Sequence, residues 1–516
     1  MSSDEEDVDL NEDSTTQIDN ASEDGTDMMD TDDPMPSTDT QQPSTVDDTV
    51  QKRVLPKMQL HANTCKSYNI IPVGAAIHPN PIYSIAATRC FRWVLTGSED
   101  GYIRKWDFFA SMNGKTMLTQ VQRHQLVDSI TKAGYLSSWW ENEEQPEEPK
   151  LKAEPSETSE ATPAPEQKLS PVYSVDIQSD GLWALSGLEN GSINLVTVRH
   201  DEGKCHHVFW KHAAPVSVLS IMPGERSFIS GSWDKTIVEW DLDTGSVQRE
   251  YGGYTSQISS VSFRPLEKEP VTTNAGDDME QDANDKEETS EQDASDANSE
   301  SEETKLEPSG PEPLSKDPNI MLTTSIDGTC LLWDRREPTE ASRRLNLPDK
   351  TPPWCLSGSY NRRAGALTVL KYTLGEGMEQ ARHNDLNAMP FDEYDFAAQK
   401  LIRSFRMPAN SGPVSCVASL PNGSHIICAS NDNIRMWNTS IDSTFTIQPG
   451  DDGGFVKPTK LSSIIPFTIL PGHHGAVISN ILIDRTSKYM ITTSGTRGWE
   501  GTSNNGCLLY DIQPVV

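Results

Sequence analysis

Histidines are the residues best able to do chemistry in this chain of 516 residues, and two pairs of the eleven are adjacent: His206 with His207, and His473 with His474. A zinc site needs three or four closely spaced His, Cys or carboxylate ligands, and no such ligand recurs beside either pair. Adjacent residues on a strand also point to opposite faces. The sequence shows no Walker-type loop, H-E-x-x-H pair or nucleophile signature. We therefore expect no catalysis, no metal and no cofactor.

The segment GTRGWEG at 495–501 has the glycine content of a phosphate-binding loop. No helix is expected after it, so the backbone amides and dipole that hold phosphate are missing. We interpret it as a turn that displays Arg497 and Trp499, two residue types that often anchor protein interfaces. The alternative that Trp499 packs over its own part of the fold stays open.

The candidate residues above lie within a sequence repeat. The clearest feature of this repeat is an Asp six residues before a Trp. This offset occurs at Asp100 and Trp106, at Asp234 and Trp240, and at Asp327 and Trp333. Weaker copies end at Val196, Tyr394, Trp437 and Tyr510. Each copy combines short strands with an Asp/Asn-Gly type turn, so the repeat predicts an all-β fold.

The intervals between these seven termini test the repeat. Val196 to Trp240 is 44 residues and Tyr394 to Trp437 is 43, within the period of about 40–45 that is typical of WD repeats. Trp240 to Trp333 is 93, and removing the acidic stretch 267–317 leaves 42. The spacing therefore predicts a WD-repeat β-propeller of seven blades over residues 59–516, with insertions in its loops.

Four residues of the clearest copy match the buried, hydrogen-bonded tetrad of WD repeats: His212, Ser230, Asp234 and Trp240. This resemblance implies that the lone His and Asp are structural rather than catalytic. A propeller must also close into a ring, because an open ring exposes sheet edges. We expect SYNIIPV at 67–73 to supply the outer strand of the last blade, and deletion of 67–80 to unfold the ring.

Several tryptophans are candidates for partner binding. Trp233 and Ile326 precede the turn Asp of two strong copies, a position that faces the narrow rim in WD-repeat proteins, and an exposed apolar residue there favours an interface. Trp139 and Trp140 lie beside the first acidic insertion. One of these two could seal a blade and the other could contact a partner, and the sequence does not separate them.

The net charge of −34 is concentrated in three segments. Residues 1–50 hold 17 acids and no Lys or Arg, and 141–166 and 267–317 carry −7 and −14, so the rest of the chain carries +4. Such segments bury too little apolar surface to fold. We expect a disordered acidic tail at 1–58 and disordered insertions at about 141–168 and 267–317. They either attract basic partners or only confer solubility.

The eight cysteines are scattered without a C-x-x-C pair, which favours a reducing compartment. The N-terminus lacks the basic and apolar regions of a signal peptide, and no stretch of about 18 apolar residues occurs. We expect a soluble intracellular protein.

Two long segments are more specific than the repeat: 106–144, which begins WDFFASMNGK, and 473–512, which contains TSGTRGWEGTSNNG. Together with FDEYDF at 391–396 and the acidic tail, they resemble the fungal WD-repeat subunit of the SAGA transcriptional coactivator, of the suppressor-of-Ty class, which engages the TATA-binding protein. The resemblance covers roughly residues 60–512.

The resemblance implies a non-catalytic scaffold in the nucleus that binds TATA-binding protein and other SAGA-like subunits and regulates delivery of TATA-binding protein to promoters. The acidic tail is compatible with a basic partner. It gives no reason to expect sequence-specific nucleic acid binding or membrane binding. A histone-binding chaperone or chromatin reader is the alternative, because the same acidic arms would screen histone charge.

Overall fold

The computed structural model describes a little over half of the chain. The described residues are 61–124, 126–145, 168–265, 316–326, 329–337, 343–344, 358–363, 366–372, 390–395, 401–406, 414–430, 433–440, 466–473, 477–495 and 505–515. All the sheets lie within one compact unit, Arg53–Val516.

The strands of this unit form seven sheets, which follow one another along the chain and are antiparallel except for the pairing of β1 with β5 in the last. The first three are β2 (Ile82–Ala87), β3 (Trp93–Ser98), β4 (Tyr102–Asp107) and β6 (Tyr135–Glu141); β7 (Ser174–Ile177), β8 (Trp183–Gly187), β9 (Ser192–Thr197) and β10 (Cys205–Trp210); and β11 (Val216–Ile221), β12 (Ser227–Ser232), β13 (Ile237–Asp241) and β14 (Val247–Tyr251).

The next three sheets are β15 (Ile258–Pro265), β16 (Lys316–Ser325), β17 (Cys330–Asp334) and β18 (Arg343–Arg344); β19 (Gly358–Arg363), β20 (Ala366–Tyr372), β21 (Pro390–Asp395) and β22 (Leu401–Arg406); and β23 (Cys416–Ser419), β24 (His425–Ala429), β25 (Ile434–Asn438) and β26 (Phe467–Leu470). Every predicted repeat terminus lies in the third strand of its sheet.

The last sheet joins the two ends of the folded unit. It contains β27 (Ile478–Ile483), β28 (Tyr489–Ser494) and β29 (Gly506–Val515), followed by β1 (Ser67–Ile77) and the two-residue β5 (Lys132–Ala133). β1 pairs antiparallel with β29 from Ser67 opposite Val515 to Ile77 opposite Gly506. The expectation that 67–73 closes the last blade is confirmed.

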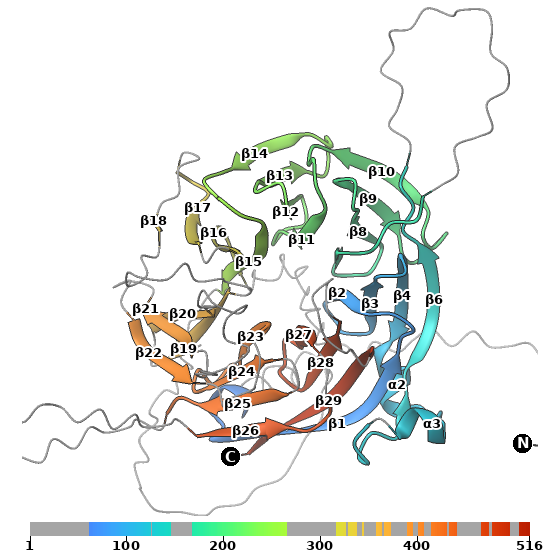
Figure 1. The fold of residues 1–516 in the computed structure, drawn as a ribbon, viewed down its shortest axis with the longest axis vertical. Helices are drawn as coiled ribbons and strands as arrows, with labels where there is room; N and C mark the ends of the chain where they lie inside the picture. The colour runs from blue at the N-terminus through green and yellow to red at the C-terminus, as the bar shows by residue number, and fades with distance from the viewer. Residues whose placement is uncertain are drawn as a thin grey trace, which may run out of the picture. The chain divides into compact units, whose positions relative to one another are not determined.

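The innermost strands contact one another in order around the ring: β2, β7, β11, β15, β19, β23, β27 and again β2 (Figure 1). Glycine permits this close approach at the end of the second strand. A Cβ on Gly187 would lie 2.6 Å from the carbonyl oxygen of Val216 in the next sheet. Gly97 and Gly231, at the same place in two strong copies, likewise leave room for Val172 and Ile258 of the neighbouring blade.

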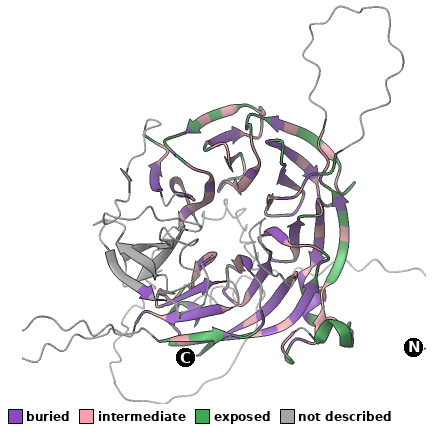
Figure 2. Ribbon diagram, in the orientation of Figure 1, coloured by how far each residue is buried: buried purple, intermediate pink, exposed green. Residues whose placement is uncertain are grey.

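Apolar clusters fill the spaces between consecutive sheets. Ile103 and Trp140 pack with Val175 and Val196 of the second sheet, and the last sheet packs on the first through residues such as Leu509. Figure 2 shows buried residues concentrated in the inner strands, whereas the outermost strands β6, β10 and β14 alternate or expose most of their residues. Each sheet whose side chains are described shares an apolar cluster with a neighbour, so its stability depends on that neighbour.

Two short helices follow the first repeat. α2 (Phe108–Asn113) begins where the side chain of Asp107 accepts a hydrogen bond from the Ala110 amide at 2.8 Å. α3 (Gln120–Arg123) begins with a capping box formed by Thr119 and Gln122. Both lie in the 106–144 segment, which the repeat pattern did not explain.

The structure corrects two boundaries and qualifies the blade count. Residues 141–145 are not part of an insertion, since Glu141 ends β6 and Asn142 bonds to Ser186 of the next sheet. Likewise β16 begins at Lys316, inside the stretch predicted to end at 317. The all-β WD-type propeller is confirmed. Six blades are described with their side chains, whereas seven were expected. The remaining sheet, β19–β22, is described by its backbone pairing and by one buried side chain, Phe405.

Ring closure predicts a strong effect of a buried residue of β1. Ile70 is 4% exposed in the cluster shared with β29, so Ile70→Ala should lower the free energy of unfolding by about 2–5 kcal/mol in a urea titration. The neighbouring Asn69 is exposed, and Asn69→Ala should change it by less than about 0.5 kcal/mol. Equal effects of the two variants would contradict a closing role for β1.

Candidate functional site

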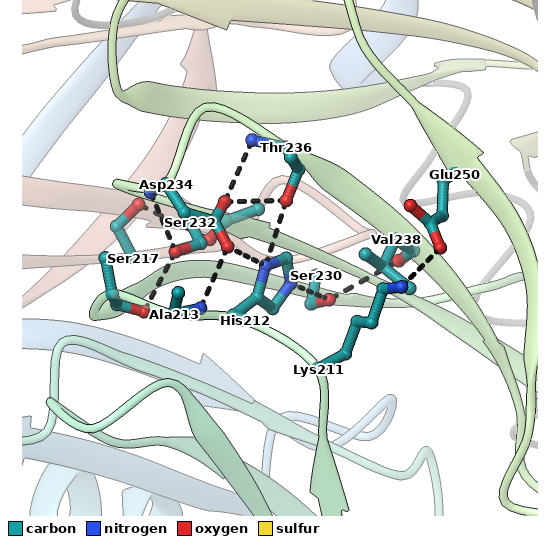
Figure 3. Close-up of polar contacts among 12 residues, drawn as sticks. Lys211, His212, Ala213, Ser217, Ser230, Ser232, Asp234, Thr236, Val238 and Glu250 are labelled. Atoms are coloured by element: carbon teal, nitrogen blue, oxygen red, sulfur yellow. Dashed lines mark hydrogen bonds and ion pairs between the residues drawn. The ribbon is translucent and has the colours of Figure 1, made fainter.

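The four predicted tetrad residues meet between the strands of the third blade. His212 Nδ1 lies 2.8 Å from Asp234 Oδ2, and His212 Nε2 lies 2.7 Å from Ser230 Oγ (Figure 3). Trp240 Nε1 donates to the same Ser230 oxygen at 2.8 Å. Asp234 is held in turn by the amide and hydroxyl of Thr236 at 2.9 and 2.6 Å.

This arrangement contains the Ser-His-Asp order of a hydrolase triad, so it could be either a catalytic site or a structural hydrogen-bond network. Ser230 is 0% exposed, as is the His212 side chain, and no substrate carbonyl can reach the hydroxyl. Trp240 also occupies one acceptor position of that oxygen. The arrangement ties together the first three strands of a blade and is not a nucleophilic site.

Hydrogen bonding holds Asp234 in its charged form. Burial alone would raise its pKa, but the bonds from His212 and Thr236 outweigh burial and keep the pKa well below the ordinary range. A carboxylate with several donors is a strong acceptor, so the tetrad gains a charge-assisted bond.

The first blade keeps only part of this pattern. His78 Nε2 and Trp106 Nε1 both contact Thr96 Oγ1, at 2.8 and 2.9 Å. Burial lowers the pKa of His78 to about 4, so it is neutral at pH 7. The predicted turn residue Asp100 bonds to Arg104 at 2.6 Å instead.

In two further blades, a residue other than histidine contacts the buried hydroxyl of the second strand. Tyr254 replaces the histidine in the fourth blade, where its hydroxyl and Trp333 Nε1 both contact Thr323 Oγ1. In the second blade Asn142 Oδ1 accepts from Ser186 Oγ at 2.8 Å. Sequence reasoning missed both residues, because neither carries the expected residue type.

Trp233 and Ile326 occupy the same structural position in neighbouring blades. The Trp233 amide donates to the Pro215 carbonyl at 3.1 Å, and the Ile326 amide donates to the Gln257 carbonyl at 2.9 Å. Within each blade, this bond joins the residue that follows the second strand to the residue that precedes the first strand. Both side chains are half-buried. Arg497 and Trp499 lie outside the described residues.

Glu99 holds this position in the first blade, and in the second blade Glu189 lies two residues after the second strand. The Glu99 amide donates to the Pro81 carbonyl at 3.0 Å, and the Glu189 amide donates to the Ser170 hydroxyl at 2.8 Å. Both side chains are exposed. This rim therefore changes from carboxylates to apolar side chains between consecutive blades.

Three aromatic rings connect these blades. Tyr83 stacks on Tyr173 with centroids 5.5 Å apart and ring planes 7° from parallel, and Tyr173 lies 5.0 Å from Trp233. Burial raises the pKa of Tyr173, and the charges of Glu189 and Glu99 raise it further. Sequence reasoning missed both tyrosines. Their positions at the start of the innermost strands, Tyr83 in IYSI and Tyr173 in VYSV, are the signal that could have identified them.

The structure separates the adjacent pair Trp139 and Trp140. Trp140 is 6% exposed and seals the contact with the second blade, whereas Trp139 is 58% exposed and meets Tyr102 edge to face at 5.4 Å. Both residues come from β6, where alternation places them on opposite faces.

No group of three or more His, Cys, Asp or Glu among the described residues could hold a metal ion. None of the helices in that part of the chain is long and apolar enough to cross a membrane.

The profile of the family described as "SPT8 beta propeller" matches residues 68–513. The chain belongs to the SPT8 β-propeller family. The matched span begins within β1 and ends within β29, so it coincides with the closed ring.

Two SPT8 relatives match most of this chain. It is 35% identical over 472 residues to SAGA complex subunit SPT8 of Saccharomyces cerevisiae, covering 87% of this chain and 73% of the relative. It is 33% identical over 489 residues to SAGA complex subunit Spt8 of Schizosaccharomyces pombe, covering 89% and 82%. U3 small nucleolar RNA-associated protein 15 of the latter organism matches over only 93 residues.

The depressed pKa of Asp234 predicts a pH-dependent contribution to stability. A group whose folded-state pKa is lowered stabilises the fold above its unfolded pKa of about 3.9, and this contribution is lost as pH falls through the folded pKa. Asp234→Asn should therefore lower the free energy of unfolding at pH 7 by about 1–3 kcal/mol, with a smaller gap at pH 3.

Urea titrations at both pH values measure this effect. Asp243→Asn, in the exposed turn after β13, is the control and should change the free energy of unfolding by less than about 0.5 kcal/mol. A gap for Asp234→Asn of the same size at pH 7 and pH 3 would contradict the charged role of Asp234.

Proposed function

We propose that this chain is a non-catalytic scaffold subunit of a SAGA-type transcription coactivator complex in the nucleus, and that it binds TATA-binding protein and regulates its delivery to promoters. The observation that carries the proposal is the similarity, over 87–89% of the chain, to two proteins named as SAGA complex subunits. Because propellers host many functions, the fold alone would not support it.

The molecule offers two elements suited to such a role. Residues 1–50 carry 17 carboxylates without a Lys or Arg, which favours a basic partner. The rim carries half-buried Trp233 and Ile326 in adjacent blades. Tryptophan is enriched among the residues that dominate binding energy. The predicted partner-binding residues Arg497 and Trp499 remain a prediction.

Binding of the purified full-length chain to TATA-binding protein tests the proposal. Trp233→Ala should weaken saturable binding at least about 10-fold, because an anchoring aromatic side chain is lost. Trp210→Ala removes an exposed tryptophan from outer strand β10 and is the matched control, expected to change affinity less than about twofold. Removing residues 1–50 should reduce the salt dependence of binding, because screening then acts on fewer charges.

Two results would redirect the proposal. Absence of binding to TATA-binding protein at any salt concentration, with tight binding to histones instead, would favour the histone chaperone. In nuclear extract, the tagged chain should co-migrate with a megadalton assembly, and a chain that migrates alone or with histones would contradict the scaffold role.

We also infer that β19–β22 is a seventh blade. Its four antiparallel strands and the contacts of β19 with β15 and β23 support this reading. Phe405 of β22 is 1% exposed and lies 5.6 Å from Trp437 of the next blade. Phe405→Ala should therefore lower the free energy of unfolding of the whole ring by about 3–5 kcal/mol in a single cooperative transition. An unchanged transition would contradict a packed seventh blade.

A further inference from the structure

Four residues form a surface on the rim of the first three blades, which we call the rim patch: Glu99, Tyr173, Glu189 and Trp233. Glu99 and Trp233 stand at the equivalent position after the second strand, where their amides donate to the Pro81 and Pro215 carbonyls. Glu189 lies two residues after β8, and its amide donates to the Ser170 hydroxyl. Tyr173 lies just before β7, one residue after the buried Val172. The patch therefore rests on backbone that the ring holds in place.

The aromatic part of the patch is rigid. Tyr173 stacks on the buried Tyr83, which is 3% exposed, and its other neighbour is Trp233 at 5.0 Å. Tyr173 and Trp233 are both half-buried, so part of each ring faces solvent. A partner that stacks on these rings would not need to order them first, which favours binding.

The charged part of the patch is negative. Glu99 and Glu189 are both exposed, and both act electrostatically on Tyr173. Lys168 lies 3.6 Å from Glu189 and 3.1 Å from Glu144, but its side chain is 64% exposed. Exposed pairs of this kind are weak, so Lys168 can give way to another cation.

We propose that the rim patch binds an arginine side chain from an extended segment of a partner protein. A guanidinium group is planar and stacks on an aromatic face, and its N–H groups match a carboxylate in a two-point contact. Tyr173 or Trp233 supplies the face, and Glu99 or Glu189 accepts the N–H groups. The carboxylates disfavour nucleic acid and the acidic segments of this chain as occupants.

This inference deepens the proposed function and rests on it for the existence of a protein partner. It goes further because it assigns the chemistry of the contact to Glu99, Tyr173 and Glu189, which the repeat pattern did not single out. It also predicts which kind of side chain the partner presents.

Matched peptides test the inference on the full-length chain. The probe is a fluorescein-labelled nine-residue peptide of glycine and serine that carries two arginines, and its partner peptide carries the uncharged isostere citrulline instead. Fluorescence anisotropy should show at least about 10-fold tighter binding of the arginine peptide. A lysine peptide should bind more weakly than the arginine peptide, because an ammonium group does not stack.

Variants connect this binding to the patch. The double variant Glu99→Gln with Glu189→Gln should weaken binding of the arginine peptide at least about 10-fold, and Tyr173→Ala should do the same, whereas Tyr173→Phe keeps the ring and should retain binding. Glu250→Gln changes an exposed carboxylate on outer strand β14 and is the control. The acidic tail is common to all variants, so the difference between the rim variants and Glu250→Gln reports on the patch.

The outcomes separate this inference from the proposed function. Equal binding of arginine and citrulline peptides, or equal binding by the double variant and Glu250→Gln, would overturn the arginine site while co-migration with a coactivator assembly still supported the scaffold role. Equal affinity for lysine and arginine would overturn the stacked guanidinium. Should Tyr173→Ala fail to fold, the double variant of Glu99 and Glu189 still tests the arginine site, because both side chains are exposed and their replacement leaves the fold intact.

Discussion

The pairing of β1 with β29 is the interaction on which the other features depend. It joins Ser67 to Val515 and Ile77 to Gly506, so residues from the two ends of the folded unit complete one sheet. Each blade has apolar faces that only its neighbours cover. Without this pairing, the clusters between consecutive blades would begin and end at solvent-exposed sheets. Asn480 adds a bond from the last blade to the Tyr83 carbonyl of the first at 3.1 Å.

In three of the blades the constraint is a buried hydroxyl that needs partners. Ser230, Thr96 and Thr323 each accept an N–H from a tryptophan and contact a second polar side chain. That second side chain is histidine twice and tyrosine once. An unsatisfied buried hydroxyl is costly, whereas the type of its partner matters little. The tetrad therefore tolerates substitution, and a Ser-His-Asp order inside it carries no catalytic meaning.

The sequence predicted what depends on local spacing. The offset from Asp to Trp located three of the third strands, the weaker copies located the others, and the segment at 67–73 located the closing strand. It could not predict contacts that depend on three-dimensional register. Tyr83 and Tyr173 are 90 residues apart and stack only because adjacent blades align their innermost strands. Asn142 was assigned to an insertion because its neighbours are acidic, although its amide is buried against Ser186.

The closed frame explains why the rim is free to vary. The amides of Glu99, Trp233 and Ile326 make the same backbone bond in three blades, so the side chain at this position contributes little to holding the blade together. Residue type there can follow the needs of a partner instead. The change from carboxylates in the first two blades to Trp233 and Ile326 in the next two gives one surface an acidic part and an apolar part. A partner that presents cationic side chains beside apolar ones fits such a surface in a single orientation.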